Sequence, residues 1–401
     1  MRSSKQTPPR HSEQRFRPRE ELLVFGAPLI EEPEIDEVVR TLRSGWIGSG
    51  PRVARFEADF AAYKSAPQAL AVNSCTAALH LALIASGVGP GDEVLTTPLT
   101  FCATVKAIIH TGATPVLADV DPRTMNIDPA AIASRLTPRT RAVVPVHFAG
   151  RPCDMDAIMT IARDNHLRVI EDCAHAIETE YRGRKAGTFG DFGCFSFYVT
   201  KHVVTGEGGM ILASSPHDTA RLKSLALHGM SADAWKRFSD EGYKHYQLVE
   251  CGYKYNMTDL QASLGIHQLA RVDRNHARRA QLWVAYDEAF ADLPVTLPAT
   301  PEPGTRHALH LYTLLIDEGR CGFTRDSFLV EMAARNIGVG VHYLSLAEHP
   351  FYHRTFGWRP EEYPHATRIG RQTVSIPLSP RLTDADAQDV VAAVRDVLRL
   401  R

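Results

Sequence analysis

Lys201 is the residue with the strongest potential for covalent chemistry. It follows an apolar, strand-like run over residues 193–199 and precedes the glycine-rich turn at 206–209. A lone lysine at such a place normally reaches toward solvent. A lysine kept inside beside a ligand has a chemical reason to be there, because desolvation lowers the pKa of its amine and frees it as a nucleophile. Both interpretations of Lys201 are open at this point.

Two adjacent carboxylates, Glu171 and Asp172, end another apolar run, and His175 follows three residues later. Open α/β sheets bind ligands at this end of their parallel strands. Successive strand residues point to opposite sides, so one carboxylate of the pair is expected to face a ligand. Taken singly, such an acid can also be a loop cap, and a histidine can be a satisfied core residue.

An anion site is predicted where Ser74 follows a short apolar run and precedes a helical pattern. Ser74 can cap that helix, and the amides of Cys75 and Thr76 would then face an anion at the positive end of the helix dipole. An ordinary capped helix has the same pattern.

Together, these groups meet the needs of pyridoxal phosphate. That cofactor requires a lysine for its aldehyde, a carboxylate beside its pyridine nitrogen and donors for its phosphate. The turn at 206–209 lacks the spacing of a nucleotide P-loop.

The segment that carries these residues, 69–210, alternates short apolar runs with helical patterns. This alternation predicts the α/β class, with a mainly parallel central sheet covered by helices. The predicted strands are 69–72, 93–97, 116–120, 142–146 and 167–170, and the predicted helices are 74–86, 100–110 and 154–165.

Two domains and an arm are predicted. Residues 1–20 are rich in Arg, Ser and Pro and form a mobile basic arm. Residues 21–293 form a large cofactor-binding domain that includes one long linking helix beyond Asp259, which Pro294 cannot continue. Residues 294–401 form a small α+β domain whose last helix begins at a cap formed by Thr383 and Asp386.

Composition limits the class of partner. The 401 residues carry a formal net charge of −1, so no global field attracts nucleic acid. The seven cysteines include no CxxC pair, which favours reduced thiols in a cytoplasm over disulfides or a metal site. No apolar run is long enough to span a membrane, and no signal peptide is recognised.

The ordered motifs resemble the DegT/DnrJ/EryC1/StrS family of pyridoxal-phosphate-dependent sugar aminotransferases, which have the fold-type I architecture. The resemblance covers residues 46–400 and rests on these segments: GWIGSGP at 45–51, NSCTAAL at 73–79, GDEV at 91–94, EDCAHA at 171–176, SFY at 196–198, GEGG at 206–209 and GYKYNMTD at 252–259.

The resemblance implies a role for each matched residue. Lys201 holds the cofactor as a Schiff base and moves the substrate proton, while Asp172 pairs with the pyridinium nitrogen. Phe101 stacks on the pyridine ring, although a core phenylalanine is the alternative. His175 lies near the phenolic oxygen of the cofactor. The phosphate ligands are Cys75, Thr76, Ser196 and, from a neighbouring subunit, Asn256, so a homodimer with shared sites is expected.

Three further positions bear on the site. His342 and Tyr343 match a segment that contacts substrate in the family, although this chain lacks the proline of that segment. His202 stands where Asn is common. The spacing of His342, His349 and His353 fits no standard zinc motif, so no metal is expected.

The expected reaction has two halves. Glutamate converts the cofactor to pyridoxamine phosphate, which then aminates a nucleotide-linked keto sugar. The EDCAHA and GYKYNMTD segments favour the branch that acts at C4. A C3 keto sugar or a ketocyclitol is the alternative acceptor. A sugar dehydratase of similar fold is disfavoured because those relatives replace the Schiff-base lysine, commonly by histidine, whereas this chain has Lys201. A non-catalytic regulator on this scaffold is disfavoured because Asp172, Ser196, Lys201 and Asn256 are all present.

Overall fold

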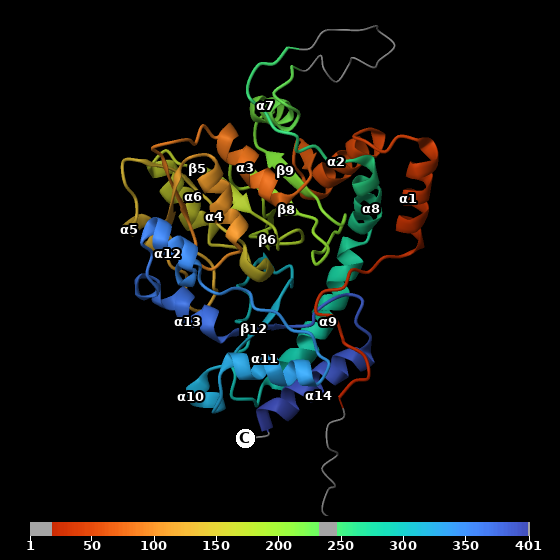
Figure 1. Ribbon diagram of the computed structural model, residues 1–401, viewed down its shortest axis with the longest axis vertical. Coiled ribbons are helices and arrows are strands. Elements are labelled where there is room, and N and C mark those ends of the chain that lie inside the picture. Colours follow the sequence, from red (N-terminus) through yellow and green to blue (C-terminus); the bar gives the residue numbers. More distant parts are fainter. Residues whose placement is uncertain (1–17, 232–246, 400–401) are drawn as a thin grey trace, which may run out of the picture.

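The structure is a computed structural model that describes residues 18–231 and 247–399 (Figure 1). Within these residues, a seven-stranded sheet has the order β1-β9-β8-β5-β4-β2-β3. β9 is antiparallel to both of its neighbours, and the remaining pairs are parallel. The predicted α/β class is confirmed. The strands are β1 (Ala69–Val72), β2 (Glu93–Thr96), β3 (Thr114–Leu117), β4 (Thr140–Val143), β5 (Arg168–Asp172), β8 (Phe192–Ser196) and β9 (Gly209–Ala213).

Helices cover both faces of this sheet because its strands are apolar on both sides. In β5, Ile170 packs on the face covered by α3, whereas Val169 packs on the opposite face. The first face carries α3 (Cys75–Ala85), α4 (Cys102–His110) and α7 (Pro216–Ala226). The second carries α2 (Pro51–Lys64), α6 (Met155–Asp164) and α8 (Asp259–Ala270). α1 (Glu32–Ser44) packs beside α8.

A second core lies around the far end of α9 (Val272–Phe290), in the lower half of Figure 1. Tyr286, Tyr312, Phe328 and Val390 are completely buried there. Its other elements are β11 (Tyr312–Leu315), α10 (Glu318–Cys321), α11 (Arg325–Ala334), β12 (Thr373–Ile376) and α14 (Asp384–Arg399). The predicted cap of α14 is confirmed, since the amide of Asp386 donates to Oγ1 of Thr383 and that of Thr383 to Oδ2 of Asp386.

The C-terminal region also reaches back to the sheet. α12 (Pro350–Phe356) and α13 (Pro364–Gln372) lie in the cluster that contains Leu117 of β3 and Val105 of α4. Figure 1 shows these two helices below α5 (Pro129–Ser134). The division of the chain at residues 293 and 294 stays a prediction. The smaller elements are η1 (Phe148–Gly150), β6 (Glu180–Tyr181), β7 (Arg184–Lys185), β10 (Thr305–Arg306), η3 (Leu346–Glu348) and η4 (Pro360–Glu362).

Several element bounds and one helix differ from the sequence-based expectations, and β5 ends two residues after the predicted run 167–170. β3 and β4 begin and end two or three residues before the predicted runs 116–120 and 142–146. The apolar pattern continues past their ends because the following loops are themselves buried, as at Val120 and Val146. The predicted single linking helix is two helices, α8 and α9, which meet at Arg271. Its backbone is not helical there, and its guanidinium donates to the carbonyl oxygen of Leu29 at 2.7 Å.

Residues 1–17 of the predicted arm lie outside the described residues. Arg19 is described and pairs with Asp386 of α14, 2.9 Å apart. No helix in the described part of the chain is both long and apolar enough to cross a membrane.

Candidate active site

A cavity of about 570 Å³ lies where β5 and β8 end and α3 begins. With one exception, the predicted site residues line it. They are Cys75, Thr76, Phe101, Asp172, His175, Ser196, Lys201, His342 and Tyr343. The exception is Asn256, whose amide donates to Oγ of Ser49 at 2.6 Å.

Asp172 is the carboxylate of the pair that faces this cavity. It lies two residues after Ile170, so the alternation of β5 places both side chains on the α3 side. Its Oδ2 accepts a hydrogen bond from Thr104 at 2.9 Å, and its Oδ1 accepts one from the amide of Ala174 at 3.1 Å. Burial raises the pKa of Asp172 because the ionised carboxylate loses its hydration, and a cation beside it would stabilise the ionised form.

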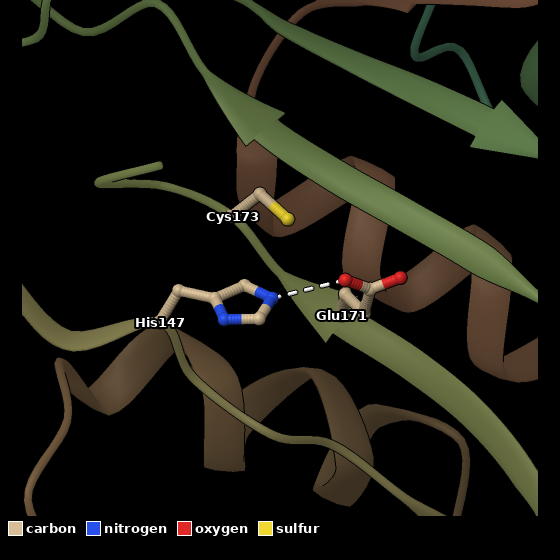
Figure 2. Close-up of side chains that lie close together, drawn as sticks. All are labelled: His147, Glu171 and Cys173. Carbon is tan, nitrogen blue, oxygen red and sulfur yellow. Dashed lines mark hydrogen bonds and ion pairs between the residues drawn. The ribbon is translucent and has the colours of Figure 1, made fainter. Parts of the chain in front are cut away.

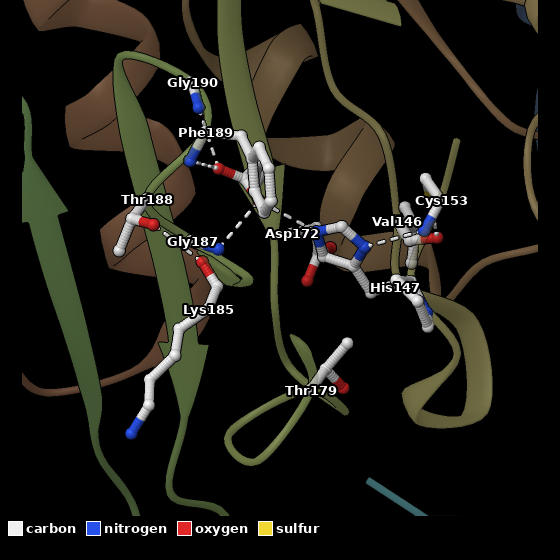
Figure 3. A network of polar contacts seen from close by, with 12 residues as sticks. Val146, His147, Cys153, Asp172, Thr179, Lys185, Gly187, Thr188, Phe189 and Gly190 are labelled. Atoms are coloured by element: carbon white, nitrogen blue, oxygen red, sulfur yellow. Dashed lines mark hydrogen bonds and ion pairs between the residues drawn. The ribbon is translucent and has the colours of Figure 1, made fainter. Parts of the chain in front are cut away.

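Glu171 does not line this cavity, and its carboxylate lies beside His147 (Figure 2). Figure 3 shows the wider polar network around His147 and the 187–190 loop. His147 Nε2 lies 3.0 Å from Oε2, and that oxygen also accepts from the amide of Gly187 at 2.7 Å. Oε1 accepts from the amides of Phe189 and Gly190 at 2.7 and 2.8 Å. Burial alone would raise the pKa of Glu171, but these donors hold it below its ordinary value. Glu171 therefore fixes the loop at 187–190 to the end of β5.

The same corner holds a set of potential metal donors, His147, Glu171 and Cys173, whose ligand atoms lie within 4.8 Å of one another (Figure 2). Nδ1 of His147 accepts from the amide of Cys153 at 3.1 Å, so its Nε2 carries the proton and donates to Glu171. Because both imidazole nitrogens and both carboxylate oxygens have protein partners, this set is a structural hydrogen-bond network.

Lys201 reaches the cavity from the loop after β8. Its backbone amide donates to the carbonyl oxygen of Tyr198 at 2.8 Å, which closes a tight turn after Ser196. The side chain is partly buried, and this burial lowers the pKa of the amine to about 8, although Cys75 and Asp172 act in the opposite direction. About one tenth of the amine is therefore uncharged at pH 7, far more than for a lysine of ordinary pKa.

The start of α3 forms the anion-binding end of the cavity. Oγ of Ser74 accepts from the amide of Ala77 at 3.1 Å, so the predicted cap is confirmed. The first-turn amides of Cys75 and Thr76 have no partner within a helix of this geometry. Gly209 lies directly behind them, and a Cβ there would come within 2.7 Å of the nitrogen of Cys75. Only glycine lets β9 begin this close to the helix terminus.

Aromatic and histidine side chains form the remaining walls. Phe101 is 58% exposed, so the alternative of a core phenylalanine does not hold. Oη of Tyr343 lies 3.1 Å from Nε2 of His175. The ring of His342 stacks on Phe25, with 5.4 Å between ring centroids, and its Nδ1 lies 2.9 Å from Oγ of Ser375.

Sequence reasoning missed Thr104 and Phe25. Thr104 lies in the first turn of α4, three residues after Phe101, and a polar residue there is the signal that could have indicated it. Phe25 lies in an N-terminal segment that carries no local signal for a site.

These groups fit pyridoxal phosphate. The cavity combines an amine of lowered pKa, a buried carboxylate that a neighbouring cation would stabilise, a helix N-terminus for a phosphate and an exposed aromatic ring. Residues 28–395 match the model of the DegT/DnrJ/EryC1/StrS aminotransferase family. The chain belongs to this family.

Similar proteins agree with this membership. The spore coat polysaccharide biosynthesis protein SpsC of Bacillus subtilis is 48% identical over 382 residues, which cover 95% of this chain and 98% of SpsC. A putative sugar aminotransferase of Streptococcus pneumoniae, solved in its PMP form, superimposes with a TM-score of 0.87 at 31% identity, covering 94% of this chain and 98% of that one. DesV of S. venezuelae superimposes with a TM-score of 0.82 at 33% identity, covering 92% and 95%. The protein is a pyridoxal-phosphate-dependent aminotransferase.

Proposed function

We propose that this family member transfers an amino group from glutamate to a nucleotide-linked keto sugar, with the keto group at C4. The observation that carries the proposal is the meeting of Lys201, Asp172 and the start of α3 in one cavity. A sugar acceptor is supported by the similarity to sugar aminotransferases and to a polysaccharide biosynthesis protein.

Each cavity residue has a task in this proposal. When bound, the cofactor supplies an electrophilic carbon for the amino group and an electron sink for the neighbouring substrate carbon. Lys201 would hold the cofactor aldehyde, and its freed amine would accept and return the substrate proton in both half-reactions. Asp172 would hold the charge of the pyridine nitrogen. Phe101 would pack on the ring and His175 would face the phenolic oxygen, while Cys75, Thr76 and Ser196 would bind the phosphate.

We further propose that the site is shared between two subunits. Asn256 does not line the cavity of its own chain, which is consistent with a role in a neighbouring one. α1 presents exposed apolar residues at helical spacing, and the exposed pair Trp46 and Ile47 follows it. A grouped apolar surface of this kind is typical of a subunit interface. The exposed residues of α1 are Ile35, Val39 and Leu42.

A mixing experiment tests the shared site. Lys201→Ala and Asn256→Ala should each be poorly active alone. A heterodimer of the two contains one site with both residues intact, so random subunit exchange should restore about a quarter of the wild-type activity. Activity is measured before and after exchange, and exchange is verified with differently tagged chains. If verified heterodimers show no recovery, Asn256 does not act across the interface.

The position of amination is the second proposal to test. His342 and Tyr343 line the cavity and are the proposed substrate contacts. Residues beside the cofactor can decide which way the sugar ring lies when its keto carbon approaches the amino group. Assays with matched 4-keto and 3-keto nucleotide sugars should give the larger kcat/KM for the 4-keto compound. A larger value for the 3-keto sugar, or for a ketocyclitol, would refute the C4 assignment and leave the aminotransferase activity unaffected.

A further inference from the structure

A line of buried side chains leads from α9 to the back of the cavity. Arg279 pairs with Oε1 of Glu178, and Oε2 of Glu178 lies 2.5 Å from Nδ1 of His202. Nε2 of His202 lies 3.1 Å from Nδ1 of His310. The ring of His310 packs on that of His175, with centroids 4.3 Å apart and planes inclined by 33°. The five residues come from four separate segments of the chain, since His175 and Glu178 lie three positions apart, and all are buried.

The hydrogen bonds fix which nitrogens carry protons. Burial would raise the pKa of Glu178, but His202 and Arg279 hold it well below its ordinary value, so the carboxylate is ionised and accepts. Nδ1 of His202 must therefore carry a proton. Burial lowers the pKa of His202 to about 4, so the ring is neutral and its Nε2 accepts. It follows that Nδ1 of His310 carries the proton between the two rings.

The same reasoning applies to His175 at the other end of the line. Its Nδ1 accepts from the backbone amide of Ala149 at 3.3 Å, and burial keeps the pKa of the ring well below its ordinary value. Its Nε2 therefore carries the proton and donates to Oη of Tyr343. Because Tyr343 accepts this bond, its own hydroxyl proton is left for an acceptor in the cavity.

We propose that His202 and His310 are positioning residues for the cofactor site. Glu178 orients His202, His202 holds the ring of His310 by its Nδ1 proton, and His310 supports the face of His175. This support keeps Nε2 of His175 donating its hydrogen bond to Oη of Tyr343. The hydroxyl proton of Tyr343 then stays directed to the cavity. The inference rests on the proposed role of the cavity as the cofactor site, and it is independent of the identity of the sugar.

His202 offers a matched pair of substitutions. The side-chain amide of Asn can take the place of Nδ1 and donate to Glu178, but it is too short to reach His310. The oxygen of Gln can take the place of Nε2 and accept from His310. His202→Asn thus breaks the line at His310, whereas His202→Gln preserves the contact with His310 and gives up the one with Glu178, whose carboxylate still pairs with Arg279. Relatives that carry Asn at this position would lack the connection.

The experiment uses the purified holoenzyme and three readouts: the absorbance spectrum of the bound cofactor, kcat and KM for the amino-donor half-reaction, and the melting temperature. His202→Asn should change the spectrum and lower kcat by about tenfold with KM nearly unchanged, whereas the melting temperature should fall in both position-202 variants because each loses one buried hydrogen bond. His202→Gln should stay within about twofold of the wild-type kcat. His310→Asn keeps the donor to His202 but lacks the ring that supports His175, so it should behave like His202→Asn.

Two results would overturn the proposal. One is that Asn and Gln at position 202 behave alike in spectrum and kcat, whether both match wild type or both are equally impaired. The other is a His310→Asn variant with the wild-type spectrum and kcat. A failure of the proposed function has a different signature, because wild-type protein would then bind no cofactor at Lys201 or would accept no keto sugar.

Discussion

Replacing Lys201 by alanine is expected to abolish turnover and the covalent attachment of the cofactor. The amine is the only lysine nitrogen among the residues that line the described cavity, and burial already lowers its pKa to about 8. Losing both the covalent anchor and the proton carrier should lower kcat by on the order of 10⁴-fold or more. Borohydride reduction followed by peptide mass spectrometry should locate the cofactor on Lys201 in the wild type and find no attachment in the variant.

Lys64 provides a matched control. Lys64 is fully buried, and burial lowers its pKa to about 8 as it does that of Lys201, but its Nζ donates to the carbonyl oxygen of Ile177 at 2.9 Å and does not line the cavity. Lys64→Met should lose some stability while the folded fraction still binds the cofactor covalently. Normal transamination by Lys201→Ala would show that another residue is the nucleophile.

Asp172→Asn is expected to cause the second largest loss of catalytic rate, after Lys201→Ala. The substitution preserves the size of the side chain but removes the negative charge that would hold the pyridine nitrogen protonated. The electron sink weakens, so kcat should fall on the order of 10³-fold or more. The rate is measured in single turnovers with the amino donor at saturating cofactor, so that weaker cofactor binding does not contribute.

Glu171→Gln tests whether the other carboxylate of the pair has been assigned correctly. The carboxylate of Glu171 accepts hydrogen bonds from three backbone amides and lies 3.0 Å from Nε2 of His147. These contacts lie outside the cavity. A neutral amide there should lower the free energy of unfolding by about 1–3 kcal/mol. The rate per folded molecule should change little. An inactive Glu171→Gln beside a nearly normal Asp172→Asn would reverse the two assignments.

The sequence by itself determined the parts of the site that depend on local rules. Ser74 before a helical pattern indicates a cap and a free helix terminus, and the structure has this cap. The alternation of a strand requires that Glu171 and Asp172 face opposite sides. The order of anion loop, acid and lysine then indicated the cofactor and the family. These inferences succeed because capping and strand alternation involve residues only a few positions apart.

Strand alternation left open which carboxylate faces the cavity, and only the family resemblance pointed to Asp172. The tertiary structure decides it physically, because Asp172 lies on the side of β5 that α3 covers. It also decided which distant residues complete the site. Phe25 meets His342, and Thr104 meets Asp172.

The His202–His310 contact joins residues 108 positions apart. No local pattern records such a contact, because it arises only when separately formed helices, strands and loops pack against one another. The ring that supports His175 could therefore be identified only in the folded chain.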